Sequence, residues 1–202
     1  MRRRVVITGM GVVTPLGHTP DVLFRRLVAG VSGVGPITKF DARTFPTTFA
    51  AEVKGFDLAA HVPDADRWAD SGDAARFAAA AARHALAAAG LLDDPRADRD
   101  RFGVYLGTGE GSQQFDALLG STAAGSAPTS RRMDPARFAA HALTAYHPGR
   151  EYEQELHTPA GHLAEAFDFR GPVFGNLTAC AAGAQAVGEA ADLIRSGEAD
   201  AM

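Results

Sequence analysis

Apolar and polar positions alternate along the chain in a way that predicts strands and helices in turn. Apolar residues dominate 4–8, with the continuous run 5–7, and also 102–107 and 172–179. These segments indicate buried strands, because a parallel sheet covered on both faces has no polar side. A helical period follows over 70–90 and again from Ala181 onward. We expect residues 3–8, 102–107 and 173–179 to be neighbouring strands of one sheet beneath these helices, which is an α/β layered fold.

Shorter segments are punctuated by cap and turn residues. Thr19 is suited to cap a helix that has Pro20 at its first position. Residues 49–53 are predicted to form a strand, and the Ser-, Thr-, Gly- and Pro-rich stretch 120–135 to form a surface loop. The acidic segment 147–158 is expected to be an exposed insertion with a helical middle.

The only cysteine of the chain lies between a predicted strand and a predicted helix. The run that ends at Ala179 precedes Cys180, and the amphipathic helix that follows has a stop signal at Gly197. A helix N-terminus presents free backbone N–H groups and the positive end of the helix dipole. That environment favours a thiolate and supplies donors to an oxyanion on a carbonyl under attack.

A structural interpretation of the same cysteine stays open at this point. A lone cysteine in a globular protein is usually a small buried hydrophobe. The small residues 181–183 after Cys180 permit close approach either by a substrate or by a neighbouring helix.

Composition narrows the functional classes. The chain has 202 residues, of which 46% are hydrophobic and 22% charged, and its net charge is −4. This charge predicts no nucleic-acid and no membrane partner, and the longest apolar runs are too short for a transmembrane helix. A single cysteine excludes an internal disulfide and fits a reducing, cytoplasmic location.

Two other patterns are typical of ligand-binding sites but do not fit them here. The G-M-G-V-V-T stretch at 9–14 lacks the third glycine of a dinucleotide fingerprint, and Pro15 prevents a helix from starting directly on the loop. The histidines lack the i, i+4 spacing of a metal site, so neither a metal nor a cofactor is expected. They are His18, His61, His84, His141, His147, His157 and His162.

Several segments, in order, resemble one family. LTACAAGAQAVGEAADLIRSGEADAM (177–202) resembles the active-site segment of the beta-ketoacyl-acyl-carrier-protein synthases, the elongating condensing enzymes of the thiolase-like superfamily. Residues 3–19, 32–57, 102–111 and 160–172 resemble the segments that precede it in this family. The resemblance therefore implies a thiolase-like layered fold.

The resemblance also implies a reaction and its partners. Cys180 would be the nucleophile, and its backbone N–H would belong to the oxyanion hole. The reaction would be a decarboxylative Claisen condensation of a cysteine-bound acyl group with malonyl-carrier protein, in fatty acid or polyketide synthesis. The expected partners are acyl carrier protein, malonyl and acyl thioesters, and a second copy of the protein that pairs through the strand Phe174 to Thr178.

The resemblance covers only half of the family pattern. Residues 1–202 correspond to the N-terminal half of a duplicated architecture, and the family's two histidines and its lysine come from the other half. Alone, the chain is expected to be acylated at most. Two alternatives are a non-catalytic partner like the chain-length-determining subunits, against which Cys180 argues, and an inert fragment. The reading frame beyond Met202 distinguishes them.

Two positions depart from the family pattern. Glu110 stands where the family usually has an apolar residue beside the acyl pocket, so a pocket-facing carboxylate would favour short or polar acyl groups. The alternative is that the loop turns Glu110 to solvent. His157 stands where the family more often has asparagine, and no role is assigned to it.

Overall fold

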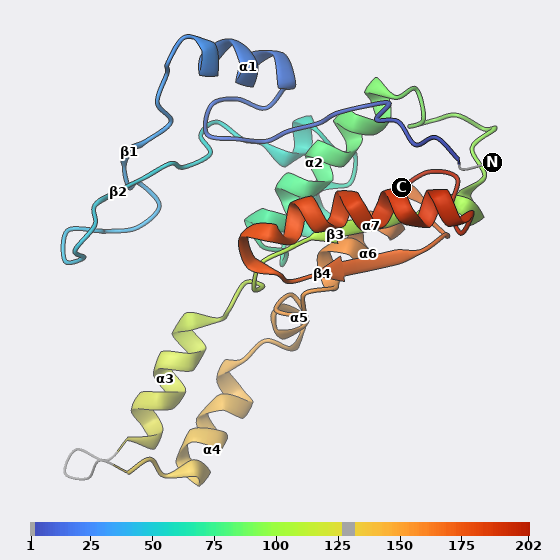
Figure 1. Cartoon of the computed structure of the whole chain (residues 1–202). Coiled ribbons are helices and arrows are strands. Elements are labelled where there is room, and N and C mark those ends of the chain that lie inside the picture. Colours follow the sequence, from blue (N-terminus) through green and yellow to red (C-terminus); the bar gives the residue numbers. More distant parts are fainter. Residues whose placement is uncertain (1–2, 127–131) are drawn as a thin grey trace.

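The computed structural model describes residues 3–126 and 132–202. Helices and short strands gather into a layered body with a helical hairpin that projects from it (Figure 1). The elements are α1 (Pro20–Val28), β1 (Gly35–Pro36), β2 (Phe49–Ala50), α2 (Asp73–Ala88), β3 (Val104–Gly107), α3 (Phe115–Gly125), α4 (Pro135–Ala145), α5 (Pro148–Tyr152), α6 (Thr158–Phe167), β4 (Val173–Asn176) and α7 (Ala182–Ser196). Short 3-10 turns lie at Leu58–Ala60, Ala65–Trp68, Arg99–Arg101 and Ala179–Ala181.

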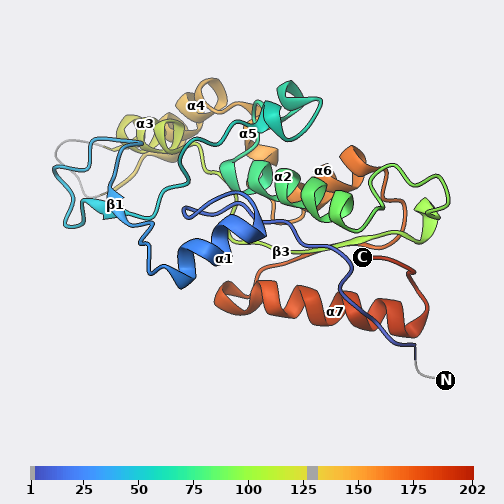
Figure 2. The same ribbon diagram turned by 90° about the horizontal axis from the view of Figure 1, so that it is seen from above.

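The centre of the body is a parallel pair of strands between helices. β3 pairs with β4 in a register that places Val104 opposite Val173 and Gly107 opposite Asn176. Helix α7 covers one face of the pair, and α6, backed by α2, covers the other (Figure 2). The α/β layered arrangement expected from the sequence is therefore confirmed for β3, β4 and the helices that cover them.

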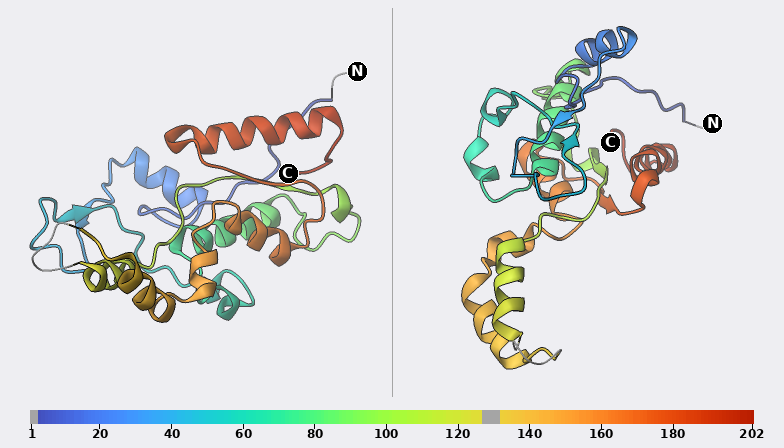
Figure 3. Two further views of the ribbon diagram at one scale, coloured as in Figure 1. Left: turned by 90° about the horizontal axis from the view of Figure 1, so that it is seen from below. Right: turned by 90° about the vertical axis from the view of Figure 1, so that its left-hand side faces the viewer.

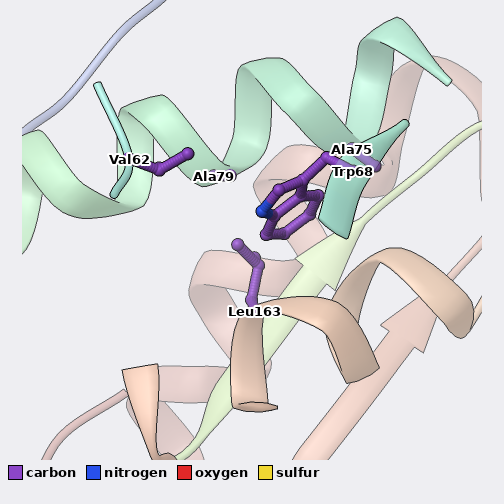
Figure 4. Close-up of a cluster of buried hydrophobic side chains, with 5 residues drawn as sticks. All are labelled: Val62, Trp68, Ala75, Ala79 and Leu163. Atoms are coloured by element: carbon purple, nitrogen blue, oxygen red, sulfur yellow. The ribbon is translucent and has the colours of Figure 1, made fainter. Parts of the chain in front are cut away.

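The main core cluster lies between α2, α6 and β3 (Figure 4). Trp68, 2% exposed, packs with Val62, Ala75, Ala79 and Leu163. The two alanines are fully or almost fully buried, and their small side chains let α2 approach its neighbours closely. The helix predicted over residues 70–90 is confirmed over Asp73–Ala88.

Both long helices of the body end on a glycine, as predicted. Gly90 has φ +69, and the amide of Leu91 donates to the carbonyl of Leu86 at 2.9 Å. Gly197 has φ +86, and the amide of Glu198 donates to the carbonyl of Leu193 at 3.0 Å. Each glycine thus adopts the left-handed conformation that closes a helix by a six-residue turn. The cap of α1 is also confirmed, since Thr19 accepts from the amide of Val22.

The prediction of a strand at residues 3–8 is wrong. This segment forms no strand in the described structure, and Val6 and Ile7 are 60% and 78% exposed. A strand needs a neighbour to satisfy its backbone groups, and here the following glycines bind the chain to a helix instead. A Cβ at Gly9 or Gly11 would lie about 2 Å from a backbone oxygen of α2.

Three further boundaries differ from expectation. Only Phe49–Ala50 of the predicted strand 49–53 is paired, with β1. The predicted loop 120–135 is wrong over 120–125, which complete α3, and residues 127–131 lie outside the described part. The segment 147–158 carries its helix at its start rather than its middle. It is also not simply exposed, because Glu153 and Thr158 are buried.

Candidate functional site

Cys180 lies on an exposed turn between β4 and α7. The strand ends at Asn176, three residues earlier than predicted, and α7 begins at Ala182. A 3-10 turn, Ala179–Ala181, fills the junction. The thiol-bearing residue is exposed, so the alternative of a buried structural cysteine is wrong for the chain as described.

The backbone turns sharply just before the cysteine. Ala179 has φ +50, in the left-handed region that residues with a side chain rarely adopt. Such a conformation is disfavoured and persists only where the surroundings fix it. It reverses the chain between the strand and the helix and presents Cys180 beside the first turn of α7.

Close packing between β3 and α7 fixes this turn. A Cβ at Gly107 would lie 2.4 Å from the carbonyl carbon of Ala182 and 2.6 Å from the amide nitrogen of Gly183. Only glycine lets the end of β3 come this near to the start of α7. Gly107, the last residue of β3, is therefore a structural requirement of the cysteine turn.

Hydrogen bonds support the same junction from the strand ends. The amide of Thr108 donates to the carbonyl of Asn176 at 2.9 Å, which extends the pairing of β3 with β4. The hydroxyl of Thr108 lies 3.3 Å from the carbonyl oxygens of Asn176 and Leu156. The hydroxyl of Thr178 donates to Gln185 on α7 at 2.9 Å. Sequence reasoning missed these residues because their role depends on the β3–β4 register.

One polar atom at this junction has no partner among the described residues. The side-chain oxygen Oδ1 of Asn176 is buried and accepts no hydrogen bond there. Its amide nitrogen lies 3.5 Å from the hydroxyl of Thr178. The last residue of β4 therefore retains an acceptor beside the cysteine turn.

Glu110 is exposed in the segment that follows β3. The neighbouring Gly111 packs against the backbone of Glu153, where an added Cβ would lie 2.3 Å from the carbonyl oxygen. The solvent-facing alternative agrees with this exposure. A contact of Glu110 with an acyl group stays a prediction.

Three of the histidines contact other ionisable side chains of the chain. Nδ1 of His61 lies 3.1 Å from Nε2 of His84, and Nε2 of His162 lies 2.8 Å from the buried carboxylate of Glu153. Burial, followed by the nearby His84 and His18, lowers the pKa of His61. Within residues 3–126 and 132–202, no group of three or more His, Cys, Asp or Glu side chains could hold a metal.

The sequence matches the family described as beta-ketoacyl synthase, N-terminal domain, over residues 2–202. The chain belongs to this family. It is 36% identical to 3-oxoacyl-[acyl-carrier-protein] synthase 2 of Coxiella burnetii, covering 100% of this chain and 44% of the relative. It is also 36% identical to the chloroplastic 3-oxoacyl-[acyl-carrier-protein] synthase I of Hordeum vulgare, over 98% of this chain and 40% of that protein.

Solved structures agree with this membership. A beta-ketoacyl synthase from Burkholderia phymatum superimposes with a TM-score of 0.74 at 29% identity, covering 98% of this chain and 45% of that one. An ishigamide ketosynthase/chain length factor superimposes with a TM-score of 0.69 at 30% identity, over 98% of this chain and 46% of that one. The chain thus spans somewhat less than half the length of these relatives and corresponds to their N-terminal half.

Proposed function

We propose that the protein of which these residues form the N-terminal half is a condensing acyltransferase with Cys180 as nucleophile. The observation that supports it is an exposed thiol on a strained turn before α7, in a chain of the beta-ketoacyl synthase family. A helix N-terminus presents backbone N–H groups that stabilise negative charge developing beside it.

The proposed reaction has two steps. The Cys180 thiolate attacks the carbonyl carbon of an acyl-carrier thioester, the carrier thiol leaves, and an acyl-cysteine thioester forms. Malonyl-carrier protein then loses carbon dioxide, and its enolate carbon attacks the acyl carbonyl. The new C–C bond releases the cysteine thiolate and leaves a β-ketoacyl thioester on the carrier. The backbone N–H of Cys180 would stabilise the oxyanion of both steps.

The two steps divide between the halves of the protein. The resemblance assigns two histidines and a lysine to the C-terminal half, and these groups would act in the malonyl step. Residues 1–202 alone would therefore support acylation at most. The 3-oxoacyl-[acyl-carrier-protein] synthase names of the relatives support acyl carrier protein as the partner, and we assign the protein to the cytoplasm. In the described residues no helix is long and apolar enough to cross a membrane.

The outer edge of β4 is suited to the proposed homodimer. β4 pairs with β3 along one edge, while Phe174 and Leu177 are 47% and 43% exposed. An unpaired strand edge with apolar side chains favours pairing with another strand. A second copy joined through Phe174 to Thr178 would cover these side chains and bring two cysteine turns near one interface.

The test of the nucleophile is the mass of the intact protein after exposure to an acyl-carrier thioester. The wild-type protein should gain one acyl group, and Cys180→Ala and Cys180→Ser should gain none, because a hydroxyl is not activated by a helix terminus alone. The Cys180→Ala variant should keep the wild-type circular dichroism and melting profile, since small residues already surround the turn. Acylation of folded Cys180→Ala protein would refute the assignment.

A further inference from the structure

A surface cavity of about 400 Å³ lies on the side of the N-terminal region, between the turn 14–17, helix α1 and the segment 31–34. Three basic side chains, His18, Arg26 and Lys54, come from separate parts of the chain and line it together with the hydroxyl-bearing residues Thr14 and Ser32. Its lining residues include no aspartate or glutamate.

This charge pattern stands out in a chain of net charge −4. Four other surface cavities each have carboxylates among their lining residues. The cavity beside Trp68, for example, sets three arginines against three aspartates. Neutralised walls of that kind favour no particular ligand charge, whereas a wall of cations without acids favours an anion.

The cations of the cavity keep unused donors. Lys54 makes no hydrogen bond or ion pair within the described residues. The nearby Glu52 carboxylate, whose pKa Lys54 helps to lower, accepts hydrogen bonds from the amides of Thr38 and Lys39 instead. Arg26 donates from Nη1 to the carbonyl of Leu16 at 3.0 Å. This single bond orients the guanidinium and leaves its other N–H groups for a ligand.

The walls of the cavity are fixed before any ligand arrives. Thr14 and Gly17 exchange two backbone hydrogen bonds of 3.0 Å, and Gly17 has φ +148. Gly33 packs on Pro15, where an added Cβ would lie 2.9 Å from the proline Cβ. A cavity whose backbone is already held in place loses little conformational freedom on binding.

We propose that this cavity binds a small molecule through a phosphate group, at a site separate from Cys180. A phosphate carries close to two negative charges and several acceptor oxygens, which match one guanidinium and one ammonium group from different segments. A carboxylate carries one charge and would leave part of this basic wall unpaired. The site is independent of the proposed condensation and of its nucleophile.

The test is calorimetric titration of inorganic phosphate into the natural protein that contains this sequence, at low ionic strength. Lys54→Met should weaken phosphate binding at least tenfold, because it removes one of the two strong cations. Arg25→Gln is the matched control: it removes the same charge from α1 but does not line the cavity, and it should change the affinity less than twofold.

A parallel titration with glycerol phosphate distinguishes a site for organic phosphate esters from a site for the free phosphate ion. Tighter binding than inorganic phosphate assigns the site to organic phosphate esters, and equal binding assigns it to the free ion. Three results overturn the proposal: no phosphate binding by the wild-type protein, acetate binding as strongly as phosphate, or equal weakening by Arg25→Gln and Lys54→Met. In the last case the protein's overall charge, and not the cavity, attracts the anion.

Discussion

The layered body and the α3–α4 hairpin are built from similar alanine-rich helices, yet the body buries large apolar side chains and the hairpin does not. The body surrounds β3 and β4 and encloses Trp68. The hairpin leaves the body and extends away from it (Figure 3). In α3 only Ala117, Ser121 and Gly125 are buried, and α4 buries no side chain over residues 135–145.

The difference lies in the range of the contacts. Segments far apart in sequence meet in the body, whereas the two hairpin helices mainly pack on each other. The Ser121 hydroxyl lies 3.1 Å from Nδ1 of His141, and the amide of Asp134, the N-cap of α4, donates to the carbonyl of Gly125 at 2.8 Å. The large apolar residues Phe115, Leu119 and Leu143 are 63%, 63% and 86% exposed. The body should therefore carry most of the stability of the chain, and the hairpin little.

The largest expected effect is that of Trp68→Ala. Truncation of this buried ring leaves a cavity at the centre of the body and should lower the free energy of unfolding by about 3–5 kcal/mol. The matched change in the hairpin, Phe115→Ala, removes an exposed ring and should alter it by less than about 0.5 kcal/mol. Urea denaturation measures both, and equal losses would contradict the comparison.

A second pair of variants compares two crowded glycines. Gly107→Ala places a methyl group against the backbone of α7 and should destabilise the protein by about 1–3 kcal/mol. Gly120→Ala meets the imidazole of His141 at 2.9 Å, and a small shift at the far end of that side chain relieves the contact. Its helix gains about 1 kcal/mol of intrinsic preference, so the net change should be close to zero.

The same variants report on the cysteine turn. Gly107→Ala should change the rate of Cys180 alkylation by iodoacetamide, because the first turn of α7 must shift. Gly109→Ala is the control, since nothing lies within 4 Å of its added Cβ. An unchanged alkylation rate in a destabilised Gly107→Ala protein would show that β3 does not position the cysteine.

The same contrast explains what the sequence could predict. The long body helices, the β3 and β4 strands and the strand–helix location of Cys180 follow from local periodicity and from glycine stop signals. Local periodicity does not predict the left-handed conformation of Ala179 or the hydrogen bond between Thr108 and Asn176. Both features arise only when distant strands align. Residues 120–125 contain the Gly, Ser and Thr that usually indicate turns, yet they complete α3.

The strand predicted at residues 3–8 is wrong because it also depended on a distant neighbour. Residues 4–8 have the composition of a buried strand, but composition does not say which strand will lie beside it. In the described structure no backbone partner is present for Val5 to Ile7, and Gly9 and Gly11 hold the chain against α2. The local pattern therefore identifies residues suited to a strand, but it does not identify the strand with which they would pair.

The smallest expected effect is the difference in acid sensitivity between a long-range ion pair and a local one. Asp200 accepts two hydrogen bonds from Arg101, which lower its pKa to about 2, and Arg3 adds to the effect. The Arg96 guanidinium likewise lowers the pKa of Asp94 to about 2. Arg101 and Asp200 meet only when the chain folds, whereas Asp94 and Arg96 are two residues apart and can pair in the unfolded chain.

Acid should therefore weaken the two pairs differently. Because folding lowers the pKa of Asp200, its stabilisation is present above about pH 4 and is lost as the pH falls towards 2. Asp200→Asn should flatten this part of the curve of unfolding free energy against pH, by a small amount because both partners are exposed. Asp94→Asn should leave the curve unchanged, since Asp94 and Arg96 can pair in both the folded and the unfolded chain. Equal flattening by the two variants would show that local pairing, and not the meeting of distant segments, sets the acid response.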